Sequence, residues 1–99
     1  MKYGWTVEQL IIGTKAGRAS ILVVLEAASG ARRRERFAAS SGSARDAVGE
    51  LARHLAYRAD VDGVRPRLRV REERTGGLVE RPDLARTFER ALDAEAADD

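Results

Sequence analysis

Residues 64–71 read V-R-P-R-L-R-V-R, a strict alternation of apolar and basic side chains. Successive side chains of a β-strand point to opposite faces, so this pattern predicts a half-buried strand with one apolar and one basic face. Pro66 cannot donate a hydrogen bond to a neighbouring strand, and we therefore expect it at a sheet edge or in a bulge. The basic face would carry Arg65, Arg67, Arg69 and Arg71.

A second basic row lies on the probable strand 32–39, where the alternate positions 32, 34 and 36 are arginines. Two such rows on one sheet could neutralise the phosphates of a nucleic acid. They could equally form a solvated face, ion-paired with nearby carboxylates such as Glu35, Glu72 and Glu73. Sheets that bind single strands usually add stacking aromatic residues, which are lacking here, so the charged surface is favoured and nucleic-acid binding is the alternative. The second row comprises Arg32, Arg34 and Arg36.

Residues 21–25 read I-L-V-V-L without interruption. A strand with one wet face alternates, whereas a continuous apolar run indicates burial on both faces. Helices of this chain can cover one face, so a second subunit or another protein is expected on the other. The run therefore predicts a homodimer or a protein partner on the apolar sheet face.

The remaining segments complete an α+β pattern. Residues 5–12 form a first strand whose apolar phase changes after Val7, which indicates a β-bulge. Apolar residues at helical spacing predict a helix over 44–56, and Pro82 suits the first turn of a second helix. Leu78 and Val79 would add a short strand. We expect the order β-β-β-α-β-(β)-α, with an antiparallel sheet of four to five strands and two helices on one face.

The 99 residues suit a single domain over 1–99, with a frayed end at 95–99. The chain has no cysteine, and its longest apolar run is too short to span a bilayer. Its first residues lack the layout of a signal peptide, so we expect a cytoplasmic protein with no membrane partner. His54 is the only histidine, and no nucleotide-binding fingerprint is present. We expect no catalytic centre, no cofactor and no metal.

The start of the predicted helix is the candidate ligand site. Free backbone N–H groups and the helix dipole converge there and can bind an anion or the carboxylate of a small ligand. The same serines could instead cap the helix, since Ser43 is followed three residues later by Asp46. The candidate residues are Ser41, Gly42, Ser43 and Asp46.

Three segments resemble the C-terminal regulatory domain of 2-isopropylmalate synthases: W-T-V-E-Q-L-I-I-G-T at 5–14, A-S-I-L-V-V-L at 19–25 and S-G-S-A-R-D-A at 41–47. In that family an apolar hairpin precedes a Gly-x-Gly-Pro-x-Asp-Ala turn into a helix. Asp46 and Ala47 match the end of that motif, whereas serines and an alanine replace its glycines and proline. The resemblance implies a dimeric regulatory module that binds an amino-acid effector near the helix start.

The basic hairpin at 30–37, which precedes a helix, is also similar to the arm-binding domain of tyrosine recombinases. That second resemblance leaves residues 60–99 unexplained and ranks lower. We therefore expect a small, dimeric, non-enzymatic regulatory or interaction module. A further hypothesis is that it binds a small anionic or amino-acid ligand at a helix N-terminus. The alternative is a nucleic-acid-binding protein that uses the arginine-rich sheet face.

Overall fold

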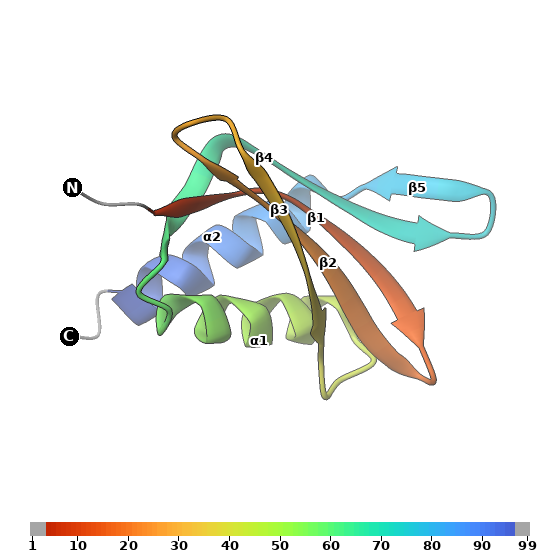
Figure 1. The fold of residues 1–99 in the computed structure, drawn as a ribbon. Coiled ribbons are helices and arrows are strands. Elements are labelled where there is room, and N and C mark those ends of the chain that lie inside the picture. Colours follow the sequence, from red (N-terminus) through yellow and green to blue (C-terminus); the bar gives the residue numbers. More distant parts are fainter. Residues whose placement is uncertain (1–3, 97–99) are drawn as a thin grey trace.

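The computed structural model describes residues 4–96, which form five strands and two helices in an α+β arrangement (Figure 1). The first three strands are an antiparallel meander, as the sequence predicts. Both helices lie on the same side of the sheet, so the domain has two layers. The elements are β1 (Trp5–Lys15), β2 (Arg18–Ala27), β3 (Arg32–Ala38), α1 (Ala44–Ala56), β4 (Val61–Arg74), β5 (Gly77–Glu80) and α2 (Pro82–Ala96).

The prediction of a wholly antiparallel sheet was wrong, because the sheet is mixed. Its strand order is β3-β2-β1-β4-β5, and β4 runs parallel to β1. The reason is the path of α1, which carries the chain from the end of β3 back to the end of the sheet where β1 begins. A strand that follows such a crossover helix must run in the same direction as the strand before it. The remaining neighbours, including β4 and β5, are antiparallel.

Two irregularities in the β1–β4 ladder matter for the arginine row. The predicted bulge in β1 is confirmed, since the register shifts between Val7 and Gln9. At the same place β4 advances from Val64 to Arg69, so residues 65–68 bulge out of the ladder. Pro66 lies in this bulge, as its missing N–H predicts. The alternating arginines therefore do not form one continuous row. Among them only Arg69 and Arg71 keep regular pairing with β1.

The core lies between the sheet and the two helices. From α1 it takes Val48 and Leu51, and from α2 it takes Leu84 and Phe88, all of them completely buried. Ser43 caps α1 by accepting a hydrogen bond from the backbone N–H of Asp46. The core-facing strand residues include Val7, Leu10, Ile12, Ile21, Val23, Leu25 and Val70.

The C-terminal helix continues to Ala96, so Glu95 belongs to α2. The rest of the tail predicted to fray, residues 97–99, lies outside the described residues. Neither helix within residues 4–96 is long and apolar enough to cross a membrane.

Candidate functional site

The face of the sheet opposite α1 and α2, here called the helix-free face, is the candidate functional surface. No helix or loop of residues 4–96 lies over it (Figure 1). The strand registers and the alternation of side chains decide which residues point to this face. They are Gln9, Ile11, Gly13, Ser20, Leu22, Val24, Glu26, Arg32, Arg34, Arg36, Arg69, Arg71, Glu73, Leu78 and Glu80.

The centre of the helix-free face is apolar. Val24 is only 5% exposed, because side chains of this same chain already cover it. Ile11 and Leu22 are half-buried and neighbour each other across β1 and β2, and Leu78 at the side is 44% exposed. The continuous apolar run of β2 therefore has one set of residues in the core and a second, smaller set on the helix-free face.

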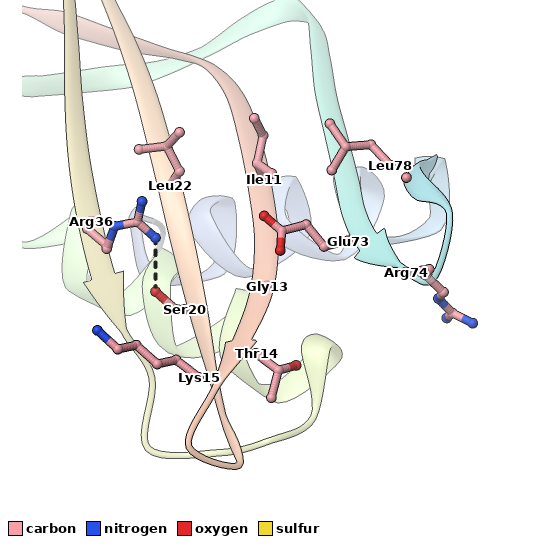
Figure 2. A pocket seen from close by; sticks show the side chains of 11 residues that line it. Ile11, Gly13, Thr14, Lys15, Ser20, Leu22, Arg36, Glu73, Arg74 and Leu78 are labelled. Atoms are coloured by element: carbon pink, nitrogen blue, oxygen red, sulfur yellow. Dashed lines mark hydrogen bonds between the residues drawn. The ribbon is translucent and has the colours of Figure 1, made fainter.

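A hollow of about 670 Å³ lies over this apolar centre (Figure 2). Ile11 and Leu22 form its floor, with Leu78 to one side. Arg36 lies beside Leu22 and donates a long hydrogen bond of 3.5 Å to the hydroxyl of Ser20. The rim is completed by Thr14, Lys15, Glu73 and Arg74.

At the end of the helix-free face where β1 begins, the arginines are ion-paired. The Glu26 carboxylate, whose side chain is 13% exposed, contacts both Arg32 and Arg65. Arg32 also approaches Glu8, with 3.2 Å between Nε and Oε2. Glu26 thus links the two predicted rows, because it contacts Arg32 of one row and Arg65 of the other. This end of the surface is a charge-balanced network.

The other predicted phosphate-binding arginines divide into two groups. Arg69 pairs with Glu80 at 2.6 Å, and Arg71 donates to the side-chain oxygen of Gln9 at 2.7 Å. Arg34 and Arg67, in contrast, form no ion pair with any residue of 4–96, and Arg36 has only its bond to Ser20. The structure therefore leaves four of the seven arginines without a carboxylate partner among the described residues: Arg34, Arg36, Arg67 and Arg71.

Two charged flanks border the apolar centre. We call Arg34 and Arg36 on β3 the basic flank, and Glu73 and Glu80 on β4 and β5 the acidic flank. The Glu73 carboxylate leans over Gly13, where an added Cβ would lie 3.0 Å from Oε2. Glu73 forms no ion pair within residues 4–96. Each flank thus has an unpaired charge directed at the same apolar centre.

The helix-start loop is closely tied to the rest of the domain. The hydroxyl of Ser43 accepts from the N–H of Asp46 at 3.4 Å, and the hydroxyl of Ser41 accepts from the N–H of Ser43 at 3.0 Å. The N–H of Ser40 donates to the Glu50 carboxylate at 3.0 Å. These N–H groups therefore have partners, and the carboxylates of Asp46 and Glu50 oppose a bound anion.

Gly42 packs this loop against the β1–β2 turn, since an added Cβ would lie 2.6 Å from the carbonyl oxygen of Gly17. Residues 41–46 thus have the geometry of a helix cap. Binding of an anionic or amino-acid ligand by Ser41, Gly42, Ser43 and Asp46 stays a prediction.

A second charged cluster lies on the helix-covered side of the sheet. Arg58 donates to both carboxylate oxygens of Glu35 and, at 2.7 Å, to Asp60. Arg33 also pairs with Glu35 at 2.9 Å and lies 5.7 Å from the ring centre of Trp5. Hydrogen bonds from Arg58 lower the pKa of both the Glu35 and the Asp60 carboxyl groups. Arg58 and Glu35 are 23 residues apart, so sequence reasoning could not pair them.

A similar cluster fixes the start of α2. Arg81 contacts Glu72 and donates two hydrogen bonds, of 3.1 and 3.0 Å, to the Asp83 carboxylate. These bonds from Arg81 lower the pKa of Asp83 to about 2. The cluster ties β4 to the helix that covers the core.

His54, the only histidine, lies on α1 next to Phe37, with 5.3 Å between the ring centres. Its side chain is exposed. Within residues 4–96 no three histidine, aspartate or glutamate side chains gather closely enough to hold a metal ion.

Comparisons of the chain with protein-family models, curated protein sequences and solved structures find no significant match. Its function therefore has to be inferred from its own geometry.

Proposed function

We propose that this chain is a small non-enzymatic interaction module that binds protein through the helix-free face. The observation that carries this proposal is the apolar centre formed by Ile11, Leu22 and Leu78, over which no described element packs. An apolar patch with a polar rim is typical of a protein-binding surface. The rim here consists of the basic and acidic flanks.

The arrangement of charges supports a protein partner over a phosphate backbone. A polyanion requires a surface of one sign, because each phosphate near a carboxylate is repelled. On the helix-free face, glutamates at positions 26, 73 and 80 lie among the arginines. A partner that presents both signs of charge fits this pattern better.

Site-specific photo-crosslinking tests the proposal. A photoreactive amino acid replaces Leu22 at the centre of the helix-free face, or Arg86 on the exposed side of α2 as the matched control. In cells that make the protein, position 22 should give a discrete adduct that resists nuclease, and position 86 should not. Mass spectrometry of the adduct then identifies the bound chain.

Adducts of equal strength at both positions, or none at position 22, would contradict the proposal. A nuclease-sensitive adduct at position 22 would instead support the second candidate function, nucleic-acid binding. That candidate is favoured by Arg34 and Arg67, which form no ion pair with the described residues and could neutralise phosphates.

A further inference from the structure

We infer that the outer edge of β3 binds an extended protein segment in which acidic and apolar residues alternate, so that the segment joins the sheet beside β3. The strand order ends at β3, which pairs only with β2. The inference goes beyond the proposed function, because this edge lies beside the helix-free face and is contacted through its backbone.

The register with β2 decides which backbone groups of β3 point outward. At one end of the ladder the N–H of Ala27 donates to the carbonyl of Ala31, and at the other the N–H of Ala39 donates to the carbonyl of Ala19, both at 2.9 Å. The register between them is continuous, so the odd-numbered residues of β3 are bonded to β2. The N–H and C=O groups of residues 32, 34, 36 and 38 therefore face away from the sheet.

The opposite edge of the sheet is less suited to a further strand. There β5 has only four residues, and the preceding part of β4 bulges at 65–68, where Pro66 has no N–H to donate. By contrast, β3 has seven residues without a shift in register. Extended protein segments commonly bind to an exposed edge of this regular kind through main-chain hydrogen bonds.

The side chains of the outward-facing residues favour an acidic segment. Arg34 and Arg36 are exposed on the helix-free face and have no carboxylate partner among residues 4–96. Directly opposite residues of neighbouring strands place their side chains on the same face. Carboxylates opposite Arg34 and Arg36 would therefore pair with both guanidinium groups, whereas basic residues there would be repelled.

The intervening residues of the added segment would face the helix-covered side. Phe37 is half-buried there, beside the exposed His54, with 5.3 Å between the ring centres. Glu35 on the same side already pairs with Arg33 and Arg58, so it requires no further charge. A β-branched or aromatic residue opposite Phe37 would contact its ring. The segment that fits is thus acidic on one face and apolar on the other.

A nucleic acid fits this edge less well than a protein segment does. Phosphates could neutralise Arg34 and Arg36, but a phosphate backbone has no regular series of N–H and C=O groups to pair with those of β3. An extended protein segment satisfies both the charges and the backbone.

An NMR titration of the full ¹⁵N-labelled chain with the end-blocked peptide Val-Glu-Val-Glu-Val-Glu-Val tests the inference. In the free protein, the amide protons of Arg34 and Arg36 should exchange rapidly with solvent, whereas those of Glu35 and Phe37 are protected by β2. The peptide should bind with a dissociation constant below about 1 mM. At saturation it should slow exchange at Arg34 and Arg36 at least about tenfold.

Two modified peptides separate backbone pairing from attraction of charge. One has the same composition in the order Glu-Glu-Glu-Val-Val-Val-Val, and the other carries N-methyl groups on the central glutamate and the valine that follows it. One of these two N–H groups faces β3 whichever direction the peptide runs. Both peptides keep the charge of the original and should bind at least about tenfold more weakly, because main-chain hydrogen bonds or their register are lost.

Reversal of charge on the protein tests the side-chain contacts. Arg34→Glu/Arg36→Glu should weaken binding of the acidic peptide at least about tenfold and should bind Val-Lys-Val-Lys-Val-Lys-Val instead. Arg34→Glu alone should have an intermediate effect. Arg86→Glu on the exposed side of α2 has the same change of charge as each single substitution and should bind the acidic peptide as the wild type does. Dispersed amide spectra of the variants show that they are folded.

The inference is wrong if the peptide leaves exchange at Arg34 and Arg36 unchanged, or if the N-methylated peptide binds as tightly as the original. Tighter binding of a seven-nucleotide oligothymidylate would assign these arginines to a phosphate backbone and would also overturn it. Each of these results leaves the proposed function to the crosslink at position 22. If β3 is protected by the peptide but position 22 gives no adduct, the proposed function fails and the inference stands.

Discussion

The two faces of the sheet consist of alternate residues of the same strands, yet they differ in how their charges are used. On the covered face Arg58 and Arg81 each contact two carboxylates, next to a core that includes the fully buried Phe88. On the helix-free face the arginines range from fully paired to unpaired, and Leu22 is half-buried. Charges on the covered face hold the fold together, whereas part of the charge on the other face is available to a partner.

The largest expected difference between the faces is in side-chain packing. Phe88→Ala should reduce the free energy of unfolding by about 3–5 kcal/mol, because it removes a fully buried ring and leaves a cavity. Leu22→Ala on the helix-free face should cost about 1 kcal/mol, because the side chain is half-buried. Urea denaturation at low micromolar concentration measures both. Equal losses would show that the helix-free face contributes as much to folding as the core does.

A smaller difference is expected between arginines. Arg58→Ala leaves Glu35 and Asp60 without their hydrogen-bond donor and should reduce the free energy of unfolding by roughly 1 kcal/mol. Arg34→Ala should change it by less than about 0.5 kcal/mol, since Arg34 forms no ion pair with the described residues. If Arg34→Ala proves as destabilising as Arg58→Ala, the distinction between the two faces is lost.

The smallest effect is a dependence on pH. Asp83 has its pKa lowered from 3.8 to about 2, so its ionised form stabilises the folded state. This contribution is fully present above about pH 4 and is lost as the pH falls through 2. Stability measured by denaturation at a series of pH values should therefore fall less steeply between pH 4 and 2 in Asp83→Asn than in the wild type.

Local chemistry made much of the fold predictable. Alternation, turns and the change of phase after Val7 indicate the strands and the bulge, and Ser43 and Pro82 indicate where the helices begin. The direction of β4 depends instead on the path of α1 across the sheet, which no local pattern encodes. For the same reason the sequence could not show that Arg65 pairs with Glu26 from two strands away, whereas Arg34 does not pair.

The free edge of the outermost strand β3 is where another chain could extend the sheet. The strand pairs only with β2, so its other edge presents unpaired backbone groups to which a further strand could add. Four arginines, at positions 32, 33, 34 and 36, stand along this edge, and a second β3 placed there would bring like charges side by side. Edge-to-edge growth into fibres is therefore opposed by the charges on β3 itself.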